Sequence, residues 1–222
     1  MYDVRNYTGL LVNELRNIFG KRLVYVGLQG SYLRGEETAE SDIDTMVVIE
    51  DFGIDDMEKY RAVIESIKDK DYSVGFVCDK AALAEWNRLE INYLKHATLD
   101  IYGSLESLLP DYTDDDIIQY IKFSLNNLSH ELTHRYIHQG RDKAFEAIEG
   151  PYKAVFFILQ DMFYLRNKVF INSKAALVPH LEGDDREVLE TAMALKNGKE
   201  IDRERAFALL FRWSKESLKN II

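Results

Sequence analysis

Two short apolar runs separated by a polar stretch most constrain the fold of this chain. The first covers residues 23–28 and the second residues 46–49, and both are rich in residues that favour β-structure. Turn-forming or charged residues bound each run, which is typical of buried strands. The polar segment between them, residues 34–41, predicts a loop or a short helix followed by a loop. The sequence therefore predicts two strands whose connection keeps a glycine turn and a pair of acids near each other.

Two aspartates lie at the start of the second strand. Side chains at alternate positions of an extended chain point to one face, so Asp42 and Asp44 present two carboxylates together while Ile43 turns toward the core. Two close anionic groups repel each other unless a cation lies beside them. Mg²⁺ prefers hard oxygen ligands, keeps several waters and is completed by the phosphates of a nucleotide. The pair therefore predicts a Mg²⁺ site held by Asp42 and Asp44.

A glycine and a serine follow the first strand. Without a Cβ atom, Gly30 lets the backbone approach a ligand closely. The amides that follow it and the Ser31 hydroxyl can donate hydrogen bonds to phosphate oxygens. One end of the predicted site thus holds metal and the other holds phosphate.

The combined spacing of these residues resembles a known family signature. Gly30-Ser31, ten intervening residues and then Asp42-Ile43-Asp44 before an apolar run resemble the DNA-polymerase-beta-like nucleotidyltransferase superfamily. Arg34, Gly35 and Ser41 fall where its small members often carry the same residues. The similarity is closest to the antibiotic nucleotidyltransferases and to the minimal nucleotidyltransferases that act as antitoxins. It covers about the first half of the chain with a specific motif, and the second half only as a helical domain of suitable length.

This resemblance implies a Mg²⁺-dependent nucleotidyltransferase with ATP or another NTP as co-substrate. Such an enzyme transfers an NMP to a hydroxyl of a small molecule such as an antibiotic and releases pyrophosphate. AMP is the favoured candidate for the transferred nucleotide. Gly30 and Ser31 are then expected to bind the β- and γ-phosphates, with help from Arg34. The alternative is an antitoxin-like nucleotidyltransferase, or an inactive nucleotide-binding protein, that acts on a protein partner.

A third carboxylate is expected because superfamily members often carry one, as metal ligand or general base, on a later strand. Residues 98–102 predict an extended segment in which Asp100 lies between two aliphatic residues, where an aspartate is otherwise costly to bury. Asp79, directly after the third predicted strand, is the rival candidate, and Glu131 in the helical part is a further one. Gly75-Phe76 occupies the middle of that third strand, where some relatives carry the acid, and this departs from the family pattern.

The predicted fold class is α+β, with a small mixed sheet flanked by helices and followed by a C-terminal helical bundle. The predicted domains are residues 1–110, the nucleotidyltransferase domain, and residues 111–222, the bundle. Thr113 is the predicted N-cap of a long helix because three aspartates follow it. Another helix is expected to begin at Pro151, which places Lys153 in a first turn from which it can reach the triphosphate across a cleft. Further predicted elements are helices over residues 3–19, 55–67, 81–95, 184–196 and 202–219 and the third strand over residues 72–78.

Residues 130–134 match the H-E-x-x-H pattern of zinc peptidases. A third ligand is missing, because His138 lies eight residues beyond His130 on the same helix, about 12 Å along the axis. We interpret the match as chance on an amphipathic helix, and a zinc hydrolase is kept as a rival that metal analysis would test.

The net charge of −10 disfavours a nucleic-acid partner and suits a cationic second substrate. Cys78 is the only cysteine, so no intramolecular disulfide can form. The sequence contains no apolar run of membrane-spanning length, so no membrane partner is expected and the expected location is cytoplasmic.

Overall fold

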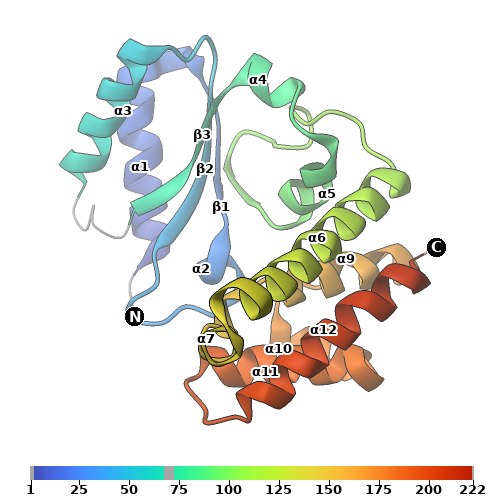
Figure 1. Ribbon diagram of the computed structural model, residues 1–222. Helices are drawn as coiled ribbons and strands as arrows, with labels where there is room; N and C mark the ends of the chain where they lie inside the picture. Colours follow the sequence, from blue (N-terminus) through green and yellow to red (C-terminus); the bar gives the residue numbers. More distant parts are fainter. Residues whose placement is uncertain (1–2, 68–72, 222) are drawn as a thin grey trace. The chain divides into compact units, whose positions relative to one another are not determined.

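The computed structural model describes residues 3–67 and 73–221 of the 222-residue chain (Figure 1). The chain divides into two compact units, Met1–Tyr112 and Thr113–Ile222. The first unit contains a sheet with helices on its faces, and the second is helical. The predicted α+β class is therefore confirmed.

The sheet of the first unit is mixed, with strand order β3-β2-β1-β4. The strands are β1 (Leu23–Leu28), β2 (Ile43–Ile49), β3 (Ser73–Asp79) and β4 (Leu99–Tyr102). Strand β1 runs antiparallel to both β2 and β4, while β3 runs parallel to β2. The four predicted strands are all present, although β2 begins at Ile43 rather than Met46, and Tyr72, predicted to open the third strand, lies outside the described residues.

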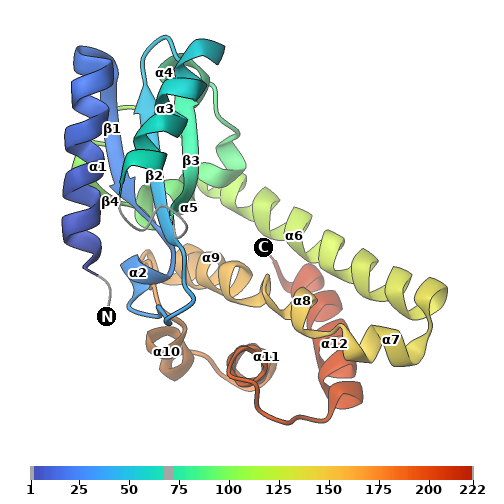
Figure 2. The same cartoon turned by 90° about the vertical axis from the view of Figure 1, so that its left-hand side faces the viewer.

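Helices cover both faces of this sheet (Figures 1 and 2). On one face, α1 (Val4–Phe19) and α3 (Ile54–Ser66) pack over alternating strand residues such as Leu28 and Val47. On the other face, α4 (Lys80–Ala84) and α5 (Arg88–His96) pack over residues such as Tyr25, Met46 and Val48. The short elements η1 (Gly20–Arg22) and α2 (Gly30–Arg34) flank β1 at its two ends. Burial of both faces explains why β1 and β2 are almost continuously apolar.

The single helix expected over residues 81–95 is two helices. The Asp79 carboxylate accepts hydrogen bonds from two backbone N–H groups in the first turn of α4. The Asn87 side chain accepts one from the Leu89 N–H and caps α5. Each cap satisfies N–H groups at the start of its own helix, so the chain breaks between them.

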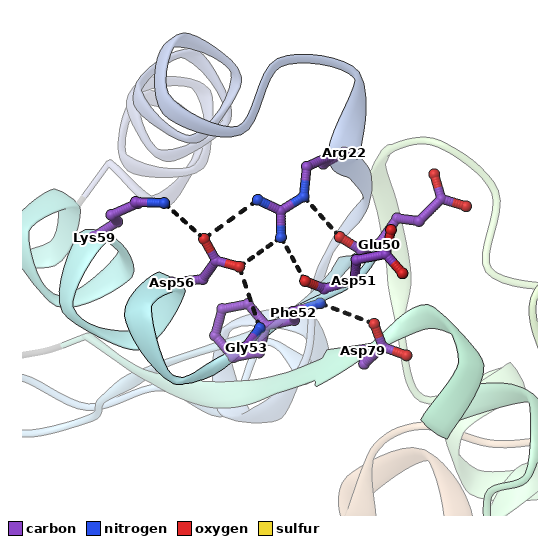
Figure 3. Close-up of polar contacts among 8 residues, drawn as sticks. All are labelled: Arg22, Glu50, Asp51, Phe52, Gly53, Asp56, Lys59 and Asp79. Carbon is purple, nitrogen blue, oxygen red and sulfur yellow. Dashed lines mark hydrogen bonds and ion pairs between the residues drawn. The ribbon is translucent and has the colours of Figure 1, made fainter.

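At the end of β2, a polar network fixes the turn into α3 (Figure 3). The Arg22 guanidinium donates to the Asp51 carbonyl oxygen (2.6 Å) and to both carboxylate oxygens of Asp56. Asp56 also accepts hydrogen bonds from Lys59 Nζ (3.0 Å) and the Gly53 N–H (3.2 Å). These contacts, the Arg22 hydrogen bond first among them, hold the pKa of Asp56 below its ordinary value. The network joins η1, the turn after β2 and α3, at the end of β2 opposite the acid pair.

The second unit begins with α6 (Asp114–His134), whose buried stripe contains Ile117, Ile121, Leu125, Leu128 and Leu132. Thr113 and Asp116 form a capping box, which confirms the predicted N-cap. The remaining elements are the π-helical turn η3 (Arg135–Gln139), α7 (Arg141–Glu146), α8 (Glu149–Tyr152), α9 (Val155–Asn167), α10 (Lys174–Leu177), the turn η4 (Val178–His180), α11 (Gly183–Lys196) and α12 (Arg203–Asn220). Within the residues the structure describes, no helix is both long and apolar enough to cross a membrane.

The helix expected to begin at Pro151 begins at Val155 instead. Pro151 lies inside the four-residue helix α8, which ends at Tyr152. The Tyr152 side chain is 2% exposed and its hydroxyl donates to the Ala206 carbonyl oxygen (2.8 Å). This buried hydrogen bond fixes the chain just before α9. Lys153 is the C-cap of α8 and is not in the first turn of a long helix.

Candidate active site

The end of β1 and the start of β2 meet at one edge of the sheet. The antiparallel register pairs Leu28 with Thr45, and the next residue, Gln29, donates its backbone N–H to the Asp44 carbonyl oxygen (2.8 Å). This pairing brings the glycine turn and the acid pair together, although they are separated in sequence by the loop after α2. Both belong to the first unit.

Gly30 and Asp44 lie in direct contact. A Cβ atom added at Gly30 would lie 1.8 Å from Asp44 Oδ2 and 2.6 Å from Asp44 Cγ, so no side chain fits there. Gly30 also has a φ of +70°, a conformation that glycine adopts without strain. The absence of a side chain at Gly30 therefore leaves the space that the Asp44 carboxylate occupies.

The two carboxylates have different surroundings. Asp42, directly before β2, is exposed, whereas Asp44 is half-buried and Ile43 between them is fully buried in the core. Burial raises the pKa of Asp44, the Arg34 charge lowers it, and the Asp42 charge raises it again. A partly desolvated carboxylate beside another one favours a bound cation. The donor set of two aspartates fits Mg²⁺, for which nucleotide phosphates and water supply the remaining ligands.

Ser31 and Arg34 lie on α2, whose C-cap is Gly35 in a left-handed conformation. The Arg34 side chain is only 14% exposed and forms an ion pair with Glu36, with Nε 3.4 Å from Oε2. Arg34 also forms a hydrogen bond with the Tyr93 side chain of α5. Burial raises the pKa of Tyr93, which lies close enough to both Arg34 and Asp44 for their charges to act on it.

Tyr93 was not singled out from the sequence. It lies on a helix far along the chain from the motif, and no local pattern marks it. Only the packing of α5 against the sheet places this phenol beside Arg34.

Asp100, the predicted third carboxylate, is on the edge strand β4. Its Oδ1 atom accepts hydrogen bonds from the Tyr25 hydroxyl (2.7 Å) and the Leu105 N–H (3.4 Å). Asp100 pairs with Gly27 in the register of β1 and β4, whereas Asp44 lies opposite Gln29 on the other side of β1. Asp100 and Asp44 are two strands apart across the sheet and offset by two residues along it. Their Cα atoms are therefore about 12 Å apart. The structure does not bring Asp100 into a common metal site with Asp44.

Asp79, the rival acid, is at the far end of β3. It pairs with Ile49, whereas Val74 of the same strand pairs with Asp44. The Asp79 carboxylate accepts hydrogen bonds from the N–H groups of Phe52, Ala81 and Ala82, which lower its pKa. These contacts give Asp79 a capping role. Strand β3 supplies no other acid, because its remaining residues are Ser73–Cys78.

The other predicted residues belong to the second unit. Glu131 forms an ion pair with Arg135 (2.8 Å), and the phosphate contact predicted for Lys153 stays a prediction. No group of three or more His, Cys, Asp and Glu side chains that could hold a metal occurs among residues 3–67 and 73–221.

Comparison with known proteins places this site in a family. Residues 11–106 match the model of the nucleotidyltransferase domain, a range that includes Gly30, Ser31, Asp42 and Asp44. A search of curated proteins found no match. Among solved structures, the spectinomycin adenyltransferase AAD(9) from Enterococcus faecialis, solved with ATP and spectinomycin, is similar with 18% identity and a TM-score of 0.61. The match covers 97% of this chain and 99% of that one, so the fold is shared across both units.

A second similar structure is a nucleotidyltransferase-like protein from Exiguobacterium sibiricum. It is 12% identical, with a TM-score of 0.41 over 93% of this chain and 74% of that chain. The family model, the strand arrangement and the contact between the glycine turn and the acid pair agree on one assignment. The chain contains, over residues 11–106, a nucleotidyltransferase domain of the DNA-polymerase-beta-like type.

Proposed function

We propose that this protein transfers an NMP from an NTP to a hydroxyl of a small molecule and releases pyrophosphate. AMP is the favoured candidate for the transferred nucleotide. The observation that carries the proposal is the contact between Gly30 and Asp44 inside a nucleotidyltransferase domain. It makes the phosphate-binding turn and the acid pair parts of one site. The phosphates of a nucleotide bound at this turn then also lie next to the two carboxylates.

Asp42 and Asp44 would hold Mg²⁺, which when bound offsets the charge on the phosphate oxygens. The backbone at Gly30 and the Ser31 hydroxyl bind the β- and γ-phosphates, as donors to their oxygens. Arg34 adds a positive charge that Glu36 and Tyr93 hold in place. The role of these side chains is to position the α-phosphorus for in-line attack by the acceptor hydroxyl.

Asp100 is our candidate for the base that takes the acceptor proton. It is an exposed carboxylate and lies on the same face of the sheet as Asp44, because the residues opposite the two acids, Gly27 and Gln29, are two apart in sequence. Its separation from Asp44 fits a residue that acts on the acceptor and not on the metal. Asp79 and Glu131 are weaker candidates, since backbone amides engage the first and Arg135 engages the second.

Two observations support a small-molecule acceptor such as an antibiotic. The spectinomycin adenyltransferase with the same fold was solved with ATP and spectinomycin, which supports ATP as donor here. The net charge of −10 favours a cationic acceptor over a polyanionic one.

A second candidate function is an antitoxin-like or inactive nucleotide-binding protein that acts on a protein partner. The register of β3 favours this candidate, because Val74 and Gly75 lie beside Asp44 and Thr45 where the strand could have supplied a third acid. A stable complex with another protein, together with nucleotide binding and no turnover, would support it.

The direct test is a pyrophosphate-release screen with ATP, GTP, CTP and UTP against hydroxylated acceptors. Asp42→Asn combined with Asp44→Asn should abolish Mg²⁺-dependent release while the circular-dichroism spectrum is unchanged. The matched control is Asp55→Asn combined with Glu58→Gln, which removes two exposed charges from α3 in the same unit. Release that persists in the first variant would refute the proposed transfer.

A further inference from the structure

Three histidines that take no part in the proposed transfer lie along the end of α6 in the second unit. His130, His134 and His138 are all exposed, and successive rings are neighbours with tilted planes. The ring centroids of His130 and His134 are 6.0 Å apart, and those of His134 and His138 are 4.9 Å apart. The tighter pair spans the change from the α-helix to the π-helical turn η3.

Aromatic contacts within the second unit support the backbone of η3. The Tyr136 ring lies 6.1 Å from the Phe145 ring of α7 and 5.5 Å from the Phe207 ring of α12, and those two rings lie 5.4 Å apart. Figure 2 shows α7 directly after the end of α6, with α12 alongside. The Arg135 ion pair with Glu131 holds the turn to the preceding helix. The backbone that carries the two imidazoles is therefore held in place before any ligand binds.

The separation of His134 and His138 fits two ligands of one metal ion. A zinc-bound imidazole nitrogen lies about 2.0 Å from the ion, so its ring centre lies about 3.2 Å from it. Two such rings at a tetrahedral angle have centres about 5 Å apart. The observed 4.9 Å matches this value, whereas the 6.0 Å between His130 and His134 would need a wider angle.

We propose that His134 and His138 form a binding site for one borderline transition-metal ion, such as Zn²⁺, Co²⁺, Ni²⁺ or Cu²⁺. Imidazole suits these ions, whereas Mg²⁺ prefers carboxylate and water oxygens. The site has two protein ligands and is completed by water, because the described part of the chain holds no group of three that could bind a metal. Glu131 is engaged by Arg135, so this site is distinct from the catalytic centre of a zinc peptidase.

Titration with Zn²⁺ in a large excess of Mg²⁺ tests this site, because Mg²⁺ occupies the hard carboxylate ligands. Zn²⁺ affinity is measured by competition with a chromophoric chelator for the wild type and for His130→Gln, His134→Gln and His138→Gln. The matched control is His180→Gln, whose ring packs 5.5 Å from Phe163 in the same unit. Circular dichroism of each variant verifies that it is folded.

The wild type is expected to bind one Zn²⁺ per chain and to melt at a higher temperature when Zn²⁺ is present. His134→Gln and His138→Gln should each lower the affinity at least tenfold and remove the shift in melting temperature, while His180→Gln keeps both. Wild-type protein that binds no Zn²⁺, or a folded His134→Gln variant that binds it normally, would overturn the proposal. A loss in His130→Gln as large as that in His138→Gln would overturn the assignment to the π-helical turn. None of these results depends on nucleotidyl transfer.

Discussion

At the scale of single residues, the candidate active site depends on the absence of a side chain at Gly30. The Asp44 carboxylate occupies the space that any side chain at Gly30 would need. Asp44 is at the same time the more buried acid of the pair, with its pKa raised chiefly by burial. A small displacement of this carboxylate therefore changes both its contacts and its environment.

Gly30→Ala should lower the rate of pyrophosphate release at least about 100-fold, the effect expected when a catalytic group moves by about 1 Å. The added methyl group would meet Asp44 Oδ2 at 1.8 Å, so the carboxylate must move away. Single-turnover kinetics with saturating ATP measures the loss, and titration with Mg²⁺ measures the change in metal affinity.

Gly35→Ala is the control for this substitution. Gly35 has a similar φ of +64°, but an added Cβ would meet nothing within 4 Å. Both variants carry comparable backbone strain, about 1 kcal/mol, and only Gly30→Ala displaces the acid. Equal losses in the two variants would show that strain in the turn, and not the contact with Asp44, controls activity.

Tyr25 and Asp100 provide a second test at this scale. A substitution at Tyr25 is expected to affect stability, whereas one at Asp100 is expected to affect turnover. Tyr25→Phe removes the buried hydroxyl that donates to Asp100 Oδ1 and should lower the free energy of unfolding by about 1 kcal/mol, measured in urea. Asp100→Asn retains an acceptor oxygen for Tyr25 but is no longer a base. Its turnover should fall by about 100-fold or more with little loss of stability. Normal turnover in Asp100→Asn would exclude Asp100 as the base.

At the scale of helices and strands, the turn between β2 and α3 depends on one buried acid. Asp56 is 6% exposed and binds Arg22, Lys59 and the Gly53 N–H (Figure 3). Because these contacts exist only in the folded protein, its pKa there is lower than in the unfolded chain. The stability that Asp56 contributes is therefore complete above the unfolded pKa of about 4 and is lost as the pH falls below it.

Asp56→Asn should accordingly lower the urea midpoint at pH 7, and the difference from the wild type should shrink as the pH falls from about 4 toward 2. The comparison requires midpoints for both proteins across this range. Asp55→Asn, an exposed acid in the first turn of the same helix, should show no such convergence. A difference that stays constant down to the lowest pH would mean that Asp56 contributes through its shape and not its charge.

Elements with local signals were predicted well from the sequence, and those set by distant contacts were not. The apolar run of β1, the stop of α1 at Gly20 and the Thr113 capping box all depend on neighbouring residues, and each is present. The start of α9 depends on Tyr152, whose hydroxyl binds a carbonyl group on α12, and no local pattern indicates it. The break between α4 and α5 did have a local signal, the Asn87 cap, which the apolar periodicity obscured.

The same distinction applies to the candidate site. Spacing along the chain predicted that Gly30, Asp42 and Asp44 lie together, because two adjacent strands bring them to one edge. The steric contact of Gly30 with Asp44 and the hydrogen bond of Arg34 with Tyr93 arise from three-dimensional packing. Asp100 shows the limit of a strand pattern. The pattern predicted an acid on a strand, but it did not predict the register that separates Asp100 from Asp44.

At the scale of the whole molecule, the acidic surface is the property most relevant to the acceptor. The chain has 38 acidic and 28 basic side chains, and ion pairs such as Arg212 with Asp184 and Lys168 with Asp114 already engage many of the basic ones. A net negative protein attracts cations from a distance and raises their association rate, and salt screens this attraction.

For a polycationic acceptor, kcat/KM at saturating Mg²⁺ and ATP should therefore fall by about tenfold between about 0.05 M and about 0.5 M salt, as the Debye length shrinks. An uncharged hydroxylated acceptor should lose much less over the same series. The comparison isolates the acceptor step, because any effect of salt on Mg²⁺ or ATP binding is common to both. Equal salt dependence for the two acceptors would show that the net charge of −10 plays no part in acceptor capture and that contacts within the site select the acceptor.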